Sequence, residues 1–173
     1  VIKKGANYGW NVKEGFTCFN AASALTPFAN CPSEDNFGNP LVDPVIVLNN
    51  FRNPAGGITT AIIGGNVYRG SDISDFKGKY IFGTFTQLPT TTNGELFVAE
   101  PRSSGTWSYR EISLKSSPND IGALLKGFGE DRKGEIYLTT STVVGPAGTT
   151  GKVFKLGEVD DDDVLPVRAA EPE

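Results

Sequence analysis

The stretch 64–85, with the sequence GGNVYRGSDISDFKGKYIFGTF, constrains the fold of this chain more than any other part of the sequence. It contains two apolar runs, at 66–69 and 80–83, and the polar gap between them ends in Lys77 and Gly78. Both runs are rich in β-branched and aromatic residues and are bordered by glycines, which is typical of two buried, neighbouring strands of an antiparallel sheet. We therefore expect a strand, a loop and a second strand here.

Arg69 stands at the end of the first of these strands, between Tyr68 and Gly70. Burying an unpaired cation is very costly. The position therefore predicts either an ion pair, with Glu95 or Asp72 as the partner, or an anionic ligand.

Short strand candidates of the same kind recur along the chain, and no segment keeps a helical period. They lie at 41–48, 95–99, 107–114, 124–128, 135–140 and 152–156. The charged segment 129–134 joins two of them and indicates a turn, in which Glu130 and Asp131 are turn formers rather than a catalytic pair. In the N-terminal loop, Tyr8, Trp10 and Phe16 are expected to anchor a turn on a core.

Evenly spaced short strands joined by glycine-containing turns predict an all-β fold. The number of strands corresponds to about two blades of a β-propeller, each a four-stranded antiparallel sheet. Since two blades cannot close a ring, either the remaining blades lie on another segment or the chain is a different β architecture, such as a small sandwich. The start of the sequence, which has no methionine and no signal-peptide pattern, is expected to lie inside a longer chain.

Charge and composition exclude several classes of function. The net charge is −4 and no basic patch is present, which argues against nucleic acid as a partner. No apolar run is long enough for a membrane span. The chain has no histidine, so neither a Ser-His nor a Cys-His pair can exist within it, and no catalytic residue is assigned.

Cys18 and Cys31 lie in one polar loop, and they are the only cysteines. Two thiols that close a short loop predict one disulfide and an oxidising compartment, which is extracellular or periplasmic. Two unrelated free thiols are the alternative. Without histidine, two cysteines cannot build a closed zinc site.

Residues 158–173 change the composition sharply, because they hold a run of four aspartates followed by proline and alanine. Like charges in a block repel one another and rarely pack. We therefore expect a folded domain over 1–157 and a flexible acidic tail over 158–173.

Four motifs in order give the sequence a resemblance to a known family. They are Gly-Ala-Asn-Tyr-Gly-Trp at 5–10, Gly-Gly-Asn-Val-Tyr-Arg-Gly at 64–70, Gly-Lys-Tyr-Ile-Phe-Gly at 78–83, and Phe-Gly-Glu-Asp at 128–131 followed by Gly-Glu-Ile-Tyr at 134–137. Together they resemble the glucose/sorbosone dehydrogenase family, which includes the soluble sugar dehydrogenases that use pyrroloquinoline quinone (PQQ) and the propeller of Hedgehog-interacting proteins. The resemblance covers residues 1 to about 157 and corresponds to the C-terminal half of the family domain.

The resemblance implies a six-bladed propeller that binds PQQ above its channel and calcium in a neighbouring loop. It places Arg69 on the anionic quinone and Tyr8 beside the calcium site. It also implies a sugar substrate oxidised at its anomeric carbon and an external electron acceptor. The half of the domain that carries the family's catalytic histidine is absent from this sequence.

Two positions depart from the family pattern, since Thr84 stands for an aspartate and Glu95 for an arginine. A carboxylate beside an anionic cofactor would repel it. The first hypothesis is a secreted, PQQ-dependent sugar dehydrogenase. The alternative is a catalytically inactive propeller that holds an extracellular protein or glycan with its loops, including 18–31 and 86–93. A structural fragment with no activity of its own is the third.

Overall fold

The computed structural model describes residues 2–53, 56–115 and 121–158. The chain divides into two compact units, Val1–Gly57 and Ile58–Glu173. We call them the N-terminal unit and the sheet unit. Apart from one short 3-10 helix, η1 (Ser74–Phe76), every regular element in the described ranges is a β-strand.

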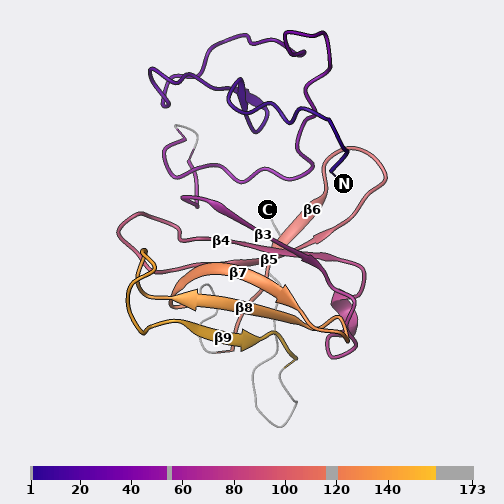
Figure 1. Cartoon of the computed structure of the whole chain (residues 1–173), viewed down its shortest axis with the longest axis vertical. Coiled ribbons are helices and arrows are strands. Elements are labelled where there is room, and N and C mark those ends of the chain that lie inside the picture. Colours follow the sequence, from indigo (N-terminus) through magenta and orange to yellow (C-terminus); the bar gives the residue numbers. More distant parts are fainter. Residues whose placement is uncertain (1, 54–55, 116–120, 159–173) are drawn as a thin grey trace. The chain divides into compact units, whose positions relative to one another are not determined.

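The sheet unit begins with a four-stranded antiparallel sheet (Figure 1). Its strands follow the chain in order and are β3 (Ile62–Val67), β4 (Tyr80–Thr84), β5 (Leu96–Glu100) and β6 (Ser108–Glu111). The predicted order of strand, loop and strand is confirmed by β3 and β4, which pair antiparallel. β3, however, ends at Val67, before Tyr68 and Arg69, and is only partly buried. The strand expected at 95–99 is confirmed as β5, whereas only four residues of the stretch 107–114 form β6.

Three further strands form the second sheet, again in chain order. They are β7 (Leu124–Glu130), β8 (Ile136–Ser141) and β9 (Lys152–Lys155). The first strand of each sheet carries an irregularity in its pairing, between Ile63 and Asn66 in β3 and between Leu125 and Gly127 in β7. The two sheets therefore repeat one plan, and β3 contacts β7 where they meet.

This arrangement confirms the predicted fold class. The described chain is all-β, its sheets are antiparallel with consecutive strands, and it is consistent with part of a β-propeller. The prediction of two four-stranded sheets is correct for β3–β6, whereas the second sheet has three strands in the residues that the structure describes.

An aliphatic core joins the two sheets. It contains Ile81, Leu96 and Val98 from the first sheet and Leu125, Ile136 and Leu138 from the second, together with Tyr68, Ile73, Phe76, Ile112 and Leu156. The sheets approach so closely that a Cβ atom on Gly83 would lie 2.4 Å from the carbonyl oxygen of Glu95 and 2.4 Å from a methyl carbon of Leu125. Only glycine fits at this position.

The other face of the first sheet is aromatic, because successive side chains of a strand point to opposite faces. Phe82 stacks on Tyr80 with ring centroids 5.7 Å apart and on Phe97 at 5.3 Å, and Tyr109 meets both phenylalanines edge to face. A sheet that is apolar on both faces suits a position between two layers, as in a propeller blade.

The strand predicted at 41–48 is wrong. Residues 42–48 form no strand, and only Pro40 and Leu41 take part in isolated bridges, with Glu34 and Asn7 respectively. Pro40 and Pro44 lack the backbone N–H that a ladder needs, so this stretch cannot pair regularly. The regular structure of the N-terminal unit is instead a small hairpin of β1 (Lys13–Glu14) and β2 (Thr17–Cys18). The sequence analysis did not predict this hairpin.

All of the expected acidic tail except Glu158 lies outside the described residues, so the flexible tail remains a prediction, and so does a single domain over 1–157. Among the described residues, no helix has the length and apolar character needed to cross a membrane.

Candidate functional site

The candidate site lies in the N-terminal unit and is built on the β1–β2 hairpin. Lys13 pairs with Cys18 and Glu14 with Thr17, so Gly15 and Phe16 form the tight turn between the strands. Gly15 has a φ of 62°, in the left-handed region that favours glycine. A Cβ atom on Gly15 would lie 3.0 Å from a methyl carbon of Val47, which shows how closely the later segment approaches the hairpin.

A disulfide joins this hairpin to the following loop. Cys18 is bonded to Cys31, with their Cα atoms 5.6 Å apart, and no free cysteine is present. The predicted disulfide is therefore confirmed. A cross-link of this kind restricts the unfolded chain and so stabilises a region that has little regular structure. It is compatible with an extracellular location.

A pocket of about 450 Å³ opens beside the disulfide. This volume falls in the range of about 300–1,000 Å³ typical of ligand pockets. Its wall comes from the hairpin, the disulfide loop and the segment 47–53. The lining residues are Glu14, Gly15, Phe16, Thr17, Cys18, Phe19, Ala24, Pro27, Val47, Leu48, Asn49, Asn50, Arg52 and Asn53.

The pocket combines an apolar wall with a polar rim of balanced charge. Phe16, Phe19 and Val47 supply apolar surface, and the charged lining residues are one carboxylate, Glu14, and one guanidinium, Arg52. The Arg52 guanidinium lies over the ring of Phe51, 5.2 Å from its centroid. Because the two charges balance, the pocket suits an uncharged, largely apolar group better than an ion.

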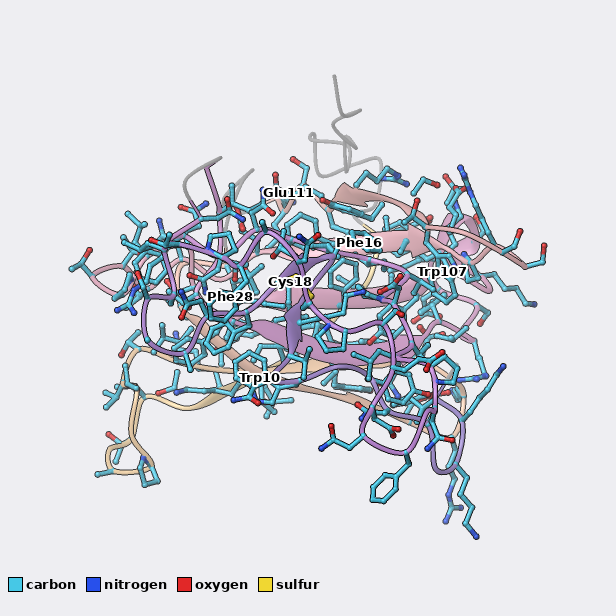
Figure 2. The ribbon with its side chains drawn as sticks, turned by 90° about the horizontal axis from the view of Figure 1, so that it is seen from above. Trp10, Phe16, Cys18, Phe28, Trp107 and Glu111 are labelled. Atoms are coloured by element: carbon cyan, nitrogen blue, oxygen red, sulfur yellow. A yellow bond between two sulfur atoms is a disulfide. The ribbon has the colours of Figure 1, made fainter. Side chains whose placement is uncertain are left out.

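Several exposed apolar side chains lie on the N-terminal unit, and one of them, Phe16, lines the pocket. Trp10 is 70% exposed and Phe16 is 51% exposed, and in the view of Figure 2 Phe16 and Phe28 lie on either side of Cys18. The expectation that Tyr8, Trp10 and Phe16 anchor a turn on a core is therefore wrong. Trp10 packs on Phe19 instead, with ring centroids 4.8 Å apart. Exposed aromatic residues of this kind are enriched at protein interfaces.

Tyr8, which the family resemblance places beside calcium, has its hydroxyl engaged by a backbone group. The backbone N–H of Lys3 donates to the Tyr8 hydroxyl oxygen at 2.6 Å. Calcium takes six to eight oxygen ligands, mostly carboxylates and carbonyls. No cluster of three or more His, Cys, Asp or Glu side chains that could hold a metal occurs within the described ranges. The donors around Tyr8 therefore fit calcium poorly, and the calcium role of Tyr8 remains a prediction.

Arg69 lies at the surface of the sheet unit, and its side chain is 62% exposed. The guanidinium donates to the carbonyl oxygen of Val67 at 3.2 Å and to Oε2 of Glu130 at 3.4 Å. An ion pair with Glu95 or Asp72 was one of the two alternatives for Arg69, and neither residue is its partner. Asp72 instead pairs with Lys155 at 2.5 Å. Arg69 pairs with Glu130 because Glu130 ends β7, and β7 contacts β3, the strand that precedes Arg69.

The surroundings of Arg69 fit PQQ, an anionic tricarboxylate, poorly. The Arg69 guanidinium is already beside the Glu130 carboxylate, which also accepts a hydrogen bond from the side-chain amide of Asn66 at 3.2 Å. A bound quinone would have to compete with that carboxylate. The assignment of Arg69 to the cofactor remains a prediction.

Glu95 and Thr84, the two departures from the family pattern, contact each other. The Thr84 hydroxyl donates to Oε2 of Glu95 at 3.3 Å, and the Gln87 amide donates to Oε1 at 2.7 Å. Both Thr84 and Glu95 are buried. Glu95 therefore has a structural role within the first sheet and the loop that follows β4, rather than a pairing role with Arg69.

Glu135 is a buried carboxylate that accepts three hydrogen bonds, and sequence reasoning missed it. Its Oε2 accepts a hydrogen bond from the Tyr68 hydroxyl at 2.7 Å, and its Oε1 accepts bonds from the backbone N–H groups of Ser71 at 2.8 Å and Asp72 at 3.2 Å. The Tyr68 hydroxyl in turn accepts a bond from the Ile73 backbone N–H at 2.8 Å. These bonds fix the β3–β4 loop to the second sheet.

The pKa values of the two side chains follow from this contact. The hydrogen bond from Tyr68 holds the pKa of Glu135 below its ordinary value. Burial, and then the bond to Glu135, raise the pKa of Tyr68 to about 12. A Cβ atom on Gly70 would lie 2.5 Å from the Glu135 carboxylate, which explains a glycine after Arg69.

Glu130 and Asp131 were both predicted to form a turn, and this is correct for Asp131 only. Asp131 is a turn former, as expected, because its Oδ1 accepts bonds from the backbone N–H groups of Lys133 at 2.8 Å and Glu135 at 3.0 Å. These backbone bonds, with that of Glu135 the strongest, lower the pKa of Asp131. Glu130, however, is the last residue of strand β7 rather than part of the turn.

Comparisons with known proteins support the class of protein that the sheets indicate. The chain is 31% identical to the HIPL1 protein of Arabidopsis thaliana over 153 residues, which is 83% of this chain and 21% of the plant protein. It is 29% identical over 105 residues to the Hedgehog-interacting proteins of Mus musculus and Homo sapiens, which is 55% of this chain and 13% of each of them. The chain therefore corresponds to a small part of the length of these relatives.

No protein-family model matches the chain. No solved structure matches it either. The similarity to Hedgehog-interacting proteins agrees with one part of the family resemblance in the sequence, whereas none of these relatives is named as a sugar dehydrogenase.

Proposed function

We propose that this chain is part of an extracellular, non-enzymatic binding propeller that holds a protein partner through the pocket of its N-terminal unit. The observation that carries the proposal is the pocket of about 450 Å³, which is lined by Cys18 of the disulfide and by the exposed ring of Phe16. The names of the animal relatives, which describe proteins that interact with Hedgehog, favour a protein as the partner.

The chemistry of the pocket suggests what it binds. Apolar walls and a charge-balanced rim suit a large uncharged side chain presented by a partner loop, with the exposed Trp10 and Phe28 contacting the surface around it. The disulfide holds the walls in place before binding, which lowers the entropy cost of association. In this proposal Phe16 is the central contact residue.

The proposal is tested by measuring binding of purified Hedgehog protein to the full chain by interferometry. Phe16→Ala should weaken binding by about 2 kcal/mol or more, the scale of a hot-spot residue. Phe37→Ala is the matched control, because Phe37 is an exposed phenylalanine of the same unit that does not line the pocket.

A second measurement addresses the pocket alone. Titration with the N-acetyl amides of tryptophan and leucine should shift the NMR signals of Phe16, Phe19 and Val47 and leave those of Phe37 unchanged. If neither probe perturbs the lining residues and wild-type protein does not bind Hedgehog, the proposal is wrong.

The sugar dehydrogenase hypothesis makes a different prediction for the same protein. If Arg69 holds an anionic quinone, the protein should bind PQQ, and Arg69→Ala should weaken that binding by about 2–5 kcal/mol, as expected when one partner of a desolvated charge pair is removed. We expect weak binding at most, because the Glu130 carboxylate beside the guanidinium would repel an anionic cofactor. Tight binding that is lost in the variant would favour the enzyme over the binding module.

A further inference from the structure

Three cations gather around one carboxylate at the end of the first sheet where β5 ends. Glu100, the last residue of β5, is paired with the Lys79 ammonium at 2.9 Å. Across the sheet it faces Ser108, whose hydroxyl accepts a hydrogen bond from Arg102 at 3.4 Å. The bond from Lys79, and then the charges of Arg110 and Arg102, hold the pKa of Glu100 below its ordinary value. We call Lys79, Arg102 and Arg110 the cation cluster.

The two arginines of this cluster are not neutralised by carboxylates of their own. Arg110 lies opposite Val98 on the face of the aliphatic core, and its guanidinium lies over the ring of Phe76, 5.8 Å from the centroid. Glu111, the next residue of β6, points to the opposite face, because side chains alternate along a strand. Within the described ranges, no ion pair joins Arg102 or Arg110 to a carboxylate.

The cation cluster therefore carries an excess of positive charge. Three cations lie around one carboxylate, Glu100, which leaves two positive charges. The neighbouring helix η1 and the residue after it add one charge of each sign, Asp75 and Lys77, so the excess is unchanged. The sequence shows no basic patch because positions 79, 102 and 110 are far apart in the chain and meet only in the folded sheet.

The acidic tail has the complementary charge. Residues 158–173 contain seven carboxylates and one arginine, which gives them a net charge of −6, whereas the whole chain has −4. Residues 1–157 therefore carry a net charge of +2. Four of the seven carboxylates are the consecutive aspartates at 160–163. The charges of the tail and of the cation cluster thus attract each other.

The tail begins at the end of the sheet unit where the cation cluster lies. Lys155, the last residue of β9, pairs with Asp72 at 2.5 Å, and Asp72 lies two residues before η1. Leu156 is buried in the aliphatic core that also contains Phe76, the residue beneath Arg110. In Figure 1, β9 likewise ends on the side of the sheet unit where the short helix lies.

The aspartates can reach the cation cluster from this point. Leu156 is the last buried residue in the described ranges, and seven residues lead from it to Asp163. Seven extended residues span about 24 Å. Stacked sheets lie about 10 Å apart, and four strands are about 14 Å across. The length of the chain is therefore sufficient to bring the aspartates from the second sheet to the far strands of the first.

We propose that the aspartates at 160–163 bind the cation cluster, so that the chain's own acidic tail covers this surface. Exposed ion pairs are individually weak, and a few of them hold a separate protein poorly. A short tether gives the tail an effective concentration of about the millimolar range, which favours it over an external acidic segment. Such pairs break and form again easily, so the contact is compatible with the predicted flexible tail. The proposal is independent of the pocket.

A spin label on the tail of the full chain tests this contact by NMR. Val164→Cys places one free thiol beside the aspartates, because the native cysteines are joined in a disulfide. A nitroxide on this thiol should broaden the amide signals of Arg102 and Arg110. It should leave the signal of Leu88, beyond the other end of β4, unchanged. Replacing the four aspartates by asparagine in the labelled chain should reduce the broadening severalfold, and so should about 1 M salt, where the Debye length is about 3 Å.

A charge variant of the cluster completes the test. Arg102→Gln removes an exposed cation and should reduce the broadening at Arg110. Lys152→Gln removes an exposed cation at the start of β9, and as the matched control it should not. If the broadening is equal in the wild-type tail and the asparagine variant, the tail is near the cluster without recognising its charge, and the proposal is wrong.

The same labelled chain distinguishes the other possible occupants of the cluster. In a mixture of spin-labelled chain with isotope-labelled chain that has no nitroxide, broadening at Arg102 and Arg110 would assign the contact to the tail of a second copy. An absence of broadening in the wild-type sequence at low salt would leave the cluster open to an external anionic partner. Either result overturns the proposal.

Discussion

The two units of this chain are stabilised in different ways. The sheet unit has an aliphatic core to which both sheets contribute, with Leu125 and Ile136 fully buried. The N-terminal unit has one hairpin of two-residue strands, a disulfide and many exposed aromatic residues. Its loops are shaped by local bonds, such as those that Asp35 accepts from the backbone N–H groups of Phe37 and Asn39 at 2.9 Å.

This difference separates the scaffold from the candidate site. A unit that buries its apolar residues in a core leaves few of them for a partner, whereas a unit held by a cross-link can keep Phe16 and Trp10 exposed. If the comparison is correct, substitutions should affect mainly the unit in which they lie.

The largest expected effect is the loss of a core side chain. Leu125→Ala should lower the free energy of unfolding of the sheet unit by about 2–5 kcal/mol, because it leaves a cavity where the two sheets meet. Denaturant unfolding followed by hydrogen exchange would measure this effect. Comparable loss of protection in the N-terminal unit would contradict the separation of the two units.

Removal of the disulfide should destabilise the N-terminal unit and leave the sheet unit unchanged. In the double variant Cys18→Ser and Cys31→Ser, the N-terminal unit should be destabilised by about 3 kcal/mol, the value for a disulfide that closes a loop of this length. Hydrogen exchange should increase in residues 2–53 and stay unchanged in the core of the sheet unit. If the core amides of β4 and β5 lose protection as well, the disulfide stabilises both units.

The same contrast explains how much of the fold could be predicted from sequence. Strands β4, β5 and β8 were predictable because strands with buried positions carry dense runs of β-branched and aromatic residues. Residues 41–48 also contain such a run, but prolines and the lack of a partner prevent pairing there. The β1–β2 hairpin was missed, since strands of two residues leave no periodic signal.

Tyr68→Phe should have the next largest effect. The variant removes the hydroxyl that donates to Glu135 and accepts from Ile73, and leaves both groups without this partner in a buried position. We expect the free energy of unfolding to fall by about 1–3 kcal/mol. Tyr80→Phe is a matched control, because the Tyr80 hydroxyl accepts one bond, from the backbone N–H of Gly65 at 3.0 Å. An equal effect of both substitutions would argue against a special role of the Glu135 contact.

Acid should weaken the same contact between the sheets. The pKa of Glu135 is lower in the folded protein than its ordinary value of 4.5. The unfolded chain therefore binds the proton first, and the stability from this group is complete above about pH 4.5 and is lost as the pH falls through the folded pKa. Thermal melts at decreasing pH should show a smaller loss in Glu135→Gln than in wild type. Parallel pH profiles of the two proteins would contradict this linkage.

The candidate site was less predictable than the fold. The cysteine pair was visible in the sequence, but the pocket beside it depends on the approach of Val47 to the hairpin turn, for which a single sequence contains no signal. The partner of Arg69 was misassigned for a related reason. Glu130 is distant in sequence and reaches Arg69 only because β3 contacts β7. Contacts between sheets are fixed by packing and not by local pattern.

The smallest expected effect concerns Arg69. Because its side chain is largely exposed and its bond to Glu130 is 3.4 Å long, Arg69→Ala should change the free energy of unfolding by less than about 1 kcal/mol. Arg69→Lys retains the charge and serves as the control, and added salt should reduce the difference between the variants. A loss of several kcal/mol would show that Arg69 contributes to the contact between the sheets as strongly as Tyr68 does. A small change would show that the fold does not require an arginine at position 69. The side chain would then be available for a role in binding.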